Sequence, residues 1–316
     1  MTAEPVAPPL ASFLAERGTI VLDGGLATEL ERRGADFRDR LWSAKVLVED
    51  PELILDVHRA YFEAGADVAI SASYQASFEG FAGRGLDRDE ADELLRLSVA
   101  LAREARDAAG RPALVAASVG PYGAILGNGA EYRGDYGKSV DELLEFHLPR
   151  MEVLVSARPD LLAIETIPSV LEAEALVRAL GRLDGPTAWI SFSCRDGERT
   201  CDGTPFERAV DVATSSPFVL AVGVNCTSPL HIHSLIEIAS ARTDVSVVVY
   251  PNAGSFWDPV RRKWADPPRQ DARPALRPAE WSEAGARLIG GCCGTGPDDI
   301  RSIAGALGRN YGVATL

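Results

Sequence analysis

Two adjacent cysteines near the end of the chain, Cys292 and Cys293, have the most distinctive chemistry in the sequence. They follow an apolar run and are flanked on both sides by glycine. Neighbouring thiols form a disulfide only with a strained peptide, because a disulfide requires restricted Cα separations and torsion angles. Two thiolates on one soft metal ion are easier to accommodate, since glycines allow the sharp turn that directs both sulfur atoms to one point. The pair therefore predicts part of a zinc site, which needs a further ligand from elsewhere.

The position of that ligand depends on the fold, and the chain alternates short apolar runs with helical segments. The predicted strands are residues 19–22, 68–71, 114–119, 161–164, 188–193, 219–224, 245–250 and 287–289. The predicted helices are residues 26–33, 51–64, 91–109, 139–157, 170–180, 207–214 and 230–241, and a further helix opens at Pro297 and Asp298. Strands that are apolar throughout predict a parallel sheet covered by helices on its outer face. Eight such units predict an α/β protein with a single-domain (β/α)8 TIM barrel.

A doubly wound open sheet is the alternative architecture. It is disfavoured because Gly24 and Gly25, after the first strand, lack the three-glycine spacing of a dinucleotide-binding turn. We expect residues 1–17 to form an N-terminal tail and lead-in and residues 18–316 to form the barrel domain. Within the tail, residues 1–9 are rich in alanine and proline, which predicts disorder and not a signal peptide.

Composition limits the classes of partner. The net charge is −14, which argues against nucleic acid and anionic membrane surfaces and favours small-molecule substrates. No apolar segment approaches the ~20 residues that span a bilayer. The five cysteines are odd in number and lack the dense spacing of a secreted disulfide scaffold, which favours reduced thiols. The sequence therefore predicts a soluble, cytoplasmic protein.

Catalytic groups of a barrel lie at the carboxyl ends of its strands. Cys226 follows the sixth predicted strand, so its thiol should face the same mouth as Cys292 and Cys293. A lone cysteine at this position is more often a small buried residue, but beside a Cys-Cys pair it is a metal ligand. Three thiolates and one open position describe a catalytic zinc site, in which a substrate thiol loses its proton at neutral pH. Alkyl transfer to sulfur is the chemistry that this site favours.

Two acids occupy equivalent strand ends. Asp23 and Glu165 are candidates to bind a cationic amino group, and the amides of Gly25, Leu26 and Ala27 at a helix start could bind a carboxylate. Together these groups describe an amino acid that carries a thiol. The alternatives are that Asp23 only caps the following helix and that Glu165 forms a structural ion pair with an arginine.

Other polar residues are weaker candidates. Four residues near predicted strand ends are candidates to line the pocket, with Asn252 also a candidate loop anchor: Tyr74, Gln75, Asn225 and Asn252. Longer segments at residues 78–88, 122–138 and 256–278 are predicted as loops over the mouth. Cys194 and Cys201 are not expected to be ligands, and His231 and His233 are spaced wrongly to share one helix face.

At this point the sequence resembles the homocysteine S-methyltransferases. The motifs that carry the resemblance are Asp23-Gly24-Gly25, Tyr74-Gln75-Ala76-Ser77, Ser118-Val119-Gly120-Pro121-Tyr122-Gly123, Glu131-Tyr132-Arg133-Gly134-Asp135-Tyr136, Glu165-Thr166, Asn225-Cys226, Val249-Tyr250-Pro251-Asn252 and Gly290-Gly291-Cys292-Cys293. The resemblance is to the branch that uses S-methylmethionine or S-adenosylmethionine as methyl donor. It implies Zn2+ on Cys226, Cys292 and Cys293, homocysteine thiolate as the fourth ligand, and methionine as product. It also implies that Asp23 and Glu165 hold the homocysteine amino group.

Two other functions remain open at this stage. The barrel could activate homocysteine and receive the methyl group from a corrinoid on a separate protein, in which case turnover would depend on cobalamin. It could also be a non-catalytic zinc barrel that binds thiols as a sensor or store, which would bind without turnover. A fold alone does not distinguish these possibilities.

Overall fold

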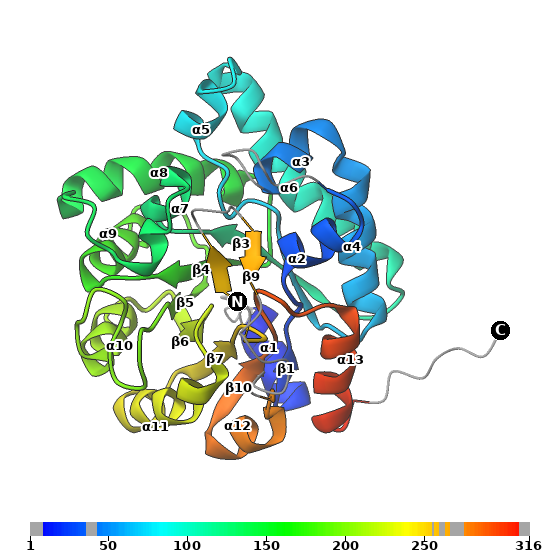
Figure 1. Ribbon diagram of the computed structural model, residues 1–316, viewed down its shortest axis with the longest axis vertical. Helices are drawn as coiled ribbons and strands as arrows, with labels where there is room; N and C mark the ends of the chain where they lie inside the picture. The colour runs from blue at the N-terminus through cyan, green and yellow to red at the C-terminus, as the bar shows by residue number, and fades with distance from the viewer. Residues whose placement is uncertain (1–8, 36–42, 255, 259–262, 266–274, 310–316) are drawn as a thin grey trace, which may run out of the picture.

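The computed structural model describes residues 9–35, 43–254, 256–258, 263–265 and 275–309. It confirms the predicted (β/α)8 barrel, drawn in Figure 1. The barrel strands are β1 (Ile20–Val21), β2 (Val68–Ile70), β3 (Leu114–Val119), β4 (Leu161–Ile167), β5 (Ala188–Phe192), β6 (Val219–Asn225), β7 (Ser246–Tyr250) and β10 (Ala286–Ile289). They pair in parallel in the order β1-β10-β7-β6-β5-β4-β3-β2. A parallel bridge between Leu22 and Val68 joins β1 to β2 and closes the barrel.

Helices surround the strands. They are α1 (Pro9–Arg17), α2 (Leu26–Arg32), α3 (Ser43–Glu49), α4 (Pro51–Glu63), α5 (Phe78–Ala82), α6 (Arg88–Ala108), α7 (Tyr122–Leu126), η1 (Ala130–Tyr132), α8 (Val140–Ser156), α9 (Val170–Leu180), α10 (Phe206–Thr214), η2 (Pro229–His231), α11 (Ile232–Arg242), α12 (Pro278–Ala284) and α13 (Pro297–Ala306). The local sequence explains where two of these helices begin, because Asp87 and Ser139 form capping boxes at the N-termini of α6 and α8. None of the described helices is both long and apolar enough to cross a bilayer.

The core has two layers, one inside the barrel and one between the strands and the helices. In β3, Leu114 and Ala116 face the barrel interior, while Val115, Ala117 and Val119 pack beneath the helices. Both sets are buried. The strands are therefore apolar on both faces, which is why they appear in the sequence as continuous apolar runs.

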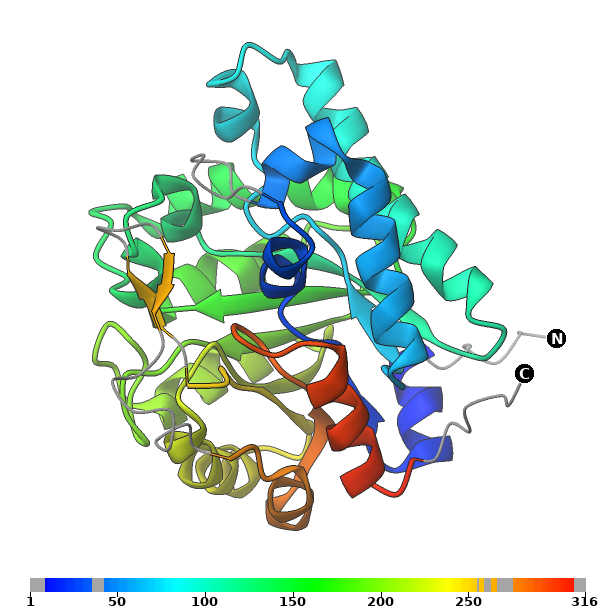
Figure 2. The ribbon, with the colours of Figure 1, turned by 45° about the vertical axis from the view of Figure 1, so that its right-hand side comes forward.

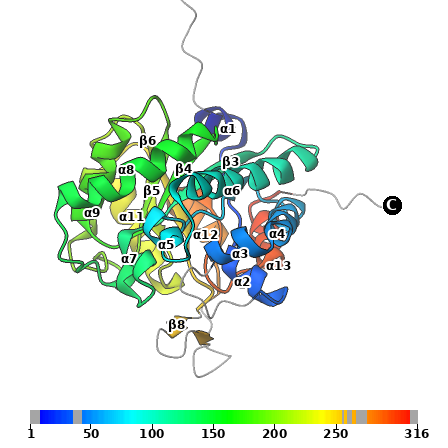
Figure 3. The same ribbon diagram turned by 90° about the horizontal axis from the view of Figure 1, so that it is seen from above.

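One end of the barrel is closed by α1. Leu10 of α1 is fully buried and packs against interior residues of the barrel, including Ile20 and Leu22. Figure 2 and Figure 3 show α1 on the side of the barrel opposite the short hairpin of β8 (Phe256–Asp258) and β9 (Lys263–Ala265). The predicted tail thus contains a helix that belongs to the core, whereas residues 1–8 lie outside the described residues.

We predict that Leu10→Ala lowers the free energy of unfolding by about 2–4 kcal/mol, because it removes a buried side chain and leaves a cavity. Leu171→Ala is the matched control, because Leu171 is 42% exposed on α9. The control should change the free energy by no more than about 0.5 kcal/mol. Urea unfolding followed by circular dichroism measures both. Equal stability of the two variants would show that α1 does not support the barrel.

The structure corrects two details at the carboxyl ends of the strands. β4 continues through Ile167, so Glu165 lies inside a strand and not after it. The β4–β5 pairing shifts register between Ile164 and Ile167, and such a bulge redirects the side chains within it. The predicted loop segments also contain structure of their own, namely α5, α7, η1 and the β8–β9 hairpin.

Candidate metal and substrate site

A cavity of about 120 Å³ lies at the carboxyl ends of the strands. It brings together most of the predicted site residues: Asp23, Gly25, Leu26, Ala27, Tyr74, Gln75, Glu165, Cys226, Cys292 and Cys293. These residues come from segments that are far apart in the sequence, and the barrel alone makes them neighbours. Asn225 and Asn252 are not among the residues that line the cavity.

The three predicted metal ligands form one cluster. The Sγ atom of Cys293 lies 3.6 Å from that of Cys226 and 3.8 Å from that of Cys292. All three sulfur atoms lie within 4.8 Å of one another. Sulfur ligands at 2.3 Å around a tetrahedral zinc ion would be separated by about 3.8 Å. The donor set and its spacing therefore fit a zinc ion with one position left for a substrate.

The backbone is strained at Cys226 and at Thr166, beside the thiol cluster. Cys226 has a φ of 46° and Thr166 has a φ of 61°, both in the left-handed region that residues other than glycine rarely adopt. Asn225 holds the two segments together: its Oδ1 accepts from the Thr166 amide at 2.7 Å, and its Nδ2 donates to the Thr166 hydroxyl at 2.7 Å. Asn225 is fully buried. It was a candidate pocket residue, but it lies behind the cavity wall and fixes the strand ends.

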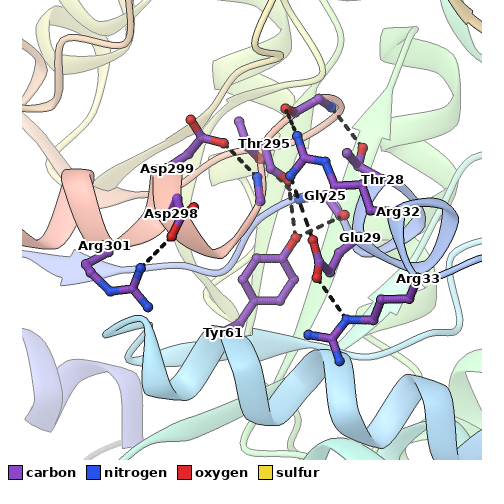
Figure 4. Close-up of polar contacts among 12 residues, drawn as sticks. Gly25, Thr28, Glu29, Arg32, Arg33, Tyr61, Thr295, Asp298, Asp299 and Arg301 are labelled. Carbon is purple, nitrogen blue, oxygen red and sulfur yellow. Dashed lines mark hydrogen bonds and ion pairs between the residues drawn. The ribbon is translucent and has the colours of Figure 1, made fainter. Parts of the chain in front are cut away.

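A second set of contacts holds the Cys292-Cys293 turn against the start of α2. Figure 4 shows three residues that take part, Thr295, Gly25 and Tyr61. The Thr295 hydroxyl donates to the Cys292 carbonyl at 2.6 Å, and the Gly25 amide donates to the Thr295 carbonyl at 3.2 Å. The Tyr61 hydroxyl reaches from α4 to the Gly25 carbonyl at 3.0 Å. The amide of Gly25 is thus occupied within the protein, which corrects its predicted role as a carboxylate donor. The amides of Leu26 and Ala27 keep that candidate role.

Asn252, the predicted loop anchor, lies in this region too. The Asn252 amide donates to the Thr227 carbonyl at 3.1 Å, and the neighbouring Ala253 amide donates to the Cys293 carbonyl at 2.8 Å. Asn252 therefore belongs to a loop that joins the segment after Cys226 to the cysteine pair. This position explains why it stands outside the cavity wall.

Gly25→Ala is expected to weaken metal binding about 10- to 100-fold, as loss of an outer-shell support does. A Cβ atom at this position would lie 2.5 Å from the Cys292 carbonyl oxygen, so the turn that carries the ligands must move. Gly305→Ala is the control, because its Cβ would have no atom within 4 Å. Competition with a zinc chelator measures both affinities. An unchanged affinity in Gly25→Ala would mean that the contact does not position the turn.

The protonation of the thiols is shared across the cluster. Hydrogen bonds from Cys292 and Cys293 lower the pKa of Cys226 well below its usual value. The same contact with Cys226 raises the pKa of Cys292 and of Cys293. In the protein alone the cluster therefore favours one thiolate, because three close negative charges repel one another. A bound dication would favour ionisation of all three thiols, which is the form that binds zinc.

Asp23 and Glu165 are both buried in the cavity wall. The Ile70 amide donates to Asp23 Oδ2 at 2.8 Å, and the Ser118 hydroxyl donates to Glu165 Oε1. Burial raises the pKa of both carboxyls, that of Glu165 to about 7, and the negative charge of Glu165 adds to the rise at Asp23. Asp23 does not cap α2, whose N-cap residue is Gly25.

Neither carboxyl has an ion-pair partner within the described part of the chain, which disfavours the structural ion pair considered for Glu165. An ionised carboxylate buried without a cation is costly. Two such groups in one cavity wall are therefore suited to a positively charged ligand.

Several lining residues were missed by the sequence reasoning. Glu131 and Tyr132 reach the cavity from η1, and Thr166 and Tyr250 line it from β4 and β7. Glu131 and Tyr132 belong to a motif that supported the family resemblance, and this was the available signal. They were not assigned to the site because they lie within a long connection and not at a strand end.

The cysteines and histidines that the sequence analysis did not assign to the site do not line the cavity. Cys194 is buried in the core, and Cys201 follows it without lining the cavity. His233 is on α11 with its Nε2 atom 3.6 Å from Glu237, and neither His231 nor His233 lines the cavity. These findings agree with the prediction that none of the four belongs to the site.

Comparison with known proteins gives one consistent result. The sequence profile described as homocysteine S-methyltransferase matches residues 20–307. The chain is 49% identical over 305 residues to homocysteine S-methyltransferase YbgG of Bacillus subtilis, covering 94% of this chain and 96% of that protein. It is 47% identical over 301 residues to the homocysteine S-methyltransferase of Escherichia coli, covering 93% of this chain and 97% of that protein.

A solved structure gives the same match in three dimensions. The metallated form of the Escherichia coli homocysteine methyltransferase MmuM superposes with a TM-score of 0.83 at 45% identity, covering 94% of this chain and 99% of that chain. The shared barrel and the sequence identity over most of both chains identify the protein as an enzyme: the chain belongs to the homocysteine S-methyltransferase family.

Proposed function

We propose that the protein transfers a methyl group from a sulfonium donor to the sulfur of L-homocysteine in a zinc-dependent reaction that forms methionine. One observation carries the proposal: three thiols at zinc-ligand spacing share a cavity with two buried carboxyls that have no cationic partner in the part of the chain that the structure describes. Homocysteine carries a thiol that could bind the metal and an amino group that could pair with the two carboxyls.

Cys226, Cys292 and Cys293 would hold the zinc ion, which when bound lowers the pKa of the homocysteine thiol and keeps its sulfur nucleophilic. Asn225, Thr295 and Tyr61 support this by fixing the segments that carry the three thiols. The thiols must stay reduced to bind metal, which suits the cytoplasmic location predicted from the sequence.

Asp23 and Glu165 would receive the homocysteine ammonium group. The charged amino group would offset the cost of ionising both buried carboxyls, and its fixed position would orient the rest of the substrate. The free amides of Leu26 and Ala27, in the first turn of α2, are the candidates for the substrate carboxylate.

The lining also favours a cationic donor. Among the described residues it contains the three acids Asp23, Glu131 and Glu165 and no lysine, arginine or histidine. In the transfer, a lone pair of the homocysteine thiolate forms a bond to the methyl carbon while the bond from that carbon to the donor sulfur breaks. The bonding electron pair returns to the donor sulfur, which becomes a neutral thioether. No proton is required by the leaving group, so the transfer needs no general acid.

The direct test measures methionine formed by reduced, zinc-loaded protein from homocysteine and, in separate reactions, S-methylmethionine, S-adenosylmethionine or betaine. Turnover with a sulfonium, and none with betaine, is the expected result and names the donor. Turnover that requires an added methylcorrinoid protein would instead support the partner-dependent reaction. Homocysteine binding without turnover under every condition would support a thiol-binding barrel.

A further inference from the structure

Among the described residues that line the cavity, Glu131 is the acid that the proposed binding of homocysteine does not use. It lies in η1, on the connection between β3 and α8, and it lines the cavity with Asp23 and Glu165. Its Oε2 atom is buried and has no hydrogen-bond partner within the described residues. A buried carboxylate oxygen without a partner is costly to retain, and so it needs an explanation.

The backbone that carries Glu131 is firmly placed. The Ser193 hydroxyl at the end of β5 donates to the Glu131 carbonyl at 3.2 Å, and the Asn128 side chain accepts from the Ala130 amide at 3.1 Å. Gly123 of α7 lies so close that a Cβ atom there would be 2.5 Å from the Glu131 amide nitrogen. The position of the carboxyl is therefore set by packing, and this suits a group that must face a ligand.

Within the described residues no positive group forms an ion pair with the Glu131 carboxyl, and the charge of Arg133 only partly offsets the rise in its pKa. Arg133 is the nearest positive group in the sequence, but its side chain is half exposed and pairs with Asp135. Burial is the main reason that the pKa of Glu131 rises to about 7, and the negative charge of Cys226 adds to that rise. A cationic ligand beside Glu131 would offset both effects.

The neighbours of Glu131 also suit a cation. Tyr74 and Tyr132 line the same cavity; burial is the main reason that the pKa of both hydroxyls is raised, and the negative charge of Glu131 adds to the rise in each, so the three groups interact. Aromatic faces attract cations, including alkylated ones that cannot donate a hydrogen bond. A sulfonium has three alkyl substituents and no acidic N–H or O–H group, so an anion with nearby aromatic rings is the environment that binds it.

We propose that Glu131 is the anionic partner of the positive sulfonium of the methyl donor and thereby selects donors that carry this charge. The proposal rests on the proposed function and assigns the acids to two substrates: Asp23 and Glu165 to homocysteine, and Glu131 to the donor. After transfer the donor sulfur is neutral, so its attraction to Glu131 is lost and the product is released more readily.

The test compares Glu131→Gln with wild type at saturating homocysteine. We expect the KM for the sulfonium donor to rise about 10- to 100-fold, as loss of one partner of a buried charge pair does, with a smaller change in kcat. Bound zinc and the KM for homocysteine should be unchanged. Glu131→Asp should recover part of the donor affinity, because it keeps the charge. Glu63→Gln on the exposed face of α4 is the matched control and should behave as wild type.

Methionine identifies which positive group of the donor is bound. It keeps the ammonium group of S-methylmethionine and lacks the sulfonium, and saturating homocysteine keeps it from the acceptor position. Its inhibition constant against the donor should therefore change less than about threefold in Glu131→Gln. If the binding of methionine and the binding of the donor were weakened equally, Glu131 would be assigned to the ammonium group and the proposal would be overturned. An unchanged KM for the donor in Glu131→Gln would also overturn the proposal. Turnover by wild type would in that case still support the proposed function. No turnover by wild type with any sulfonium would reject both.

Discussion

Replacing Cys292 with alanine is expected to remove both metal binding and methyl transfer. The variant loses one of three sulfur atoms that lie within 4.8 Å of one another. Two remaining thiols leave a zinc site with too few protein ligands, and an unbound homocysteine thiol is only a few per cent ionised at neutral pH. Loss of outer-shell partners alone costs roughly 10–100-fold, so the rate of methionine formation should fall by about 10³-fold or more. Metal analysis and a steady-state assay measure the two effects.

Cys201→Ala is the control for that experiment. Cys201 is a partly buried free thiol that does not line the cavity, so its loss should leave zinc stoichiometry and rate within about twofold of wild type. Circular dichroism should show that both variants keep the barrel. If Cys292→Ala retained stoichiometric zinc and full activity, the three-thiol site would be wrong.

The sequence was sufficient to predict the barrel and the central part of the site because both follow from strong local signals. Strands such as Leu114–Val119 are buried on both faces, so they are recognisable as apolar runs. In a parallel barrel the carboxyl ends of all strands meet at one mouth. This rule alone placed Cys226 beside Cys292 and Cys293, although Cys226 and Cys292 lie 66 positions apart in the sequence.

The sequence could not predict what depends on details of packing. The bulge at Glu165 and the left-handed backbone of Thr166 and Cys226 arise from contacts between β4, β5 and β6. Asn225 was expected to face the cavity, but neighbouring side chains along a strand point to opposite faces, and Asn225 lies behind the wall whereas Cys226 lines the cavity. Glu131 reaches the cavity from a short helix within a long connection, where no periodic pattern fixes its direction.

Glu165→Gln is expected to lower kcat/KM for homocysteine about 100-fold, mainly through KM. Glutamine keeps the shape of the side chain and removes the negative charge that would hold the substrate ammonium group. Losing one partner of a buried charge pair costs about 3 kcal/mol, which is roughly 100-fold. Asp23→Asn should have a similar effect. The double variant should lose less than the product of the two, because both acids would act on one ammonium group.

The pH dependence of wild type gives a second, independent prediction for Glu165. Burial raises the pKa of Glu165 to about 7, so the charged form that binds an ammonium group is lost as the pH falls through this value. In protein that keeps its zinc, kcat/KM for homocysteine should therefore decrease about tenfold per pH unit below pH 7. In Glu165→Gln the decrease that is due to Glu165 should be lost, and the pH dependence that remains should come from other groups such as Asp23, whose pKa is also raised by burial. If the variant kept the wild-type profile, Glu165 would not be the group that titrates, and its assignment to the substrate ammonium group would be lost.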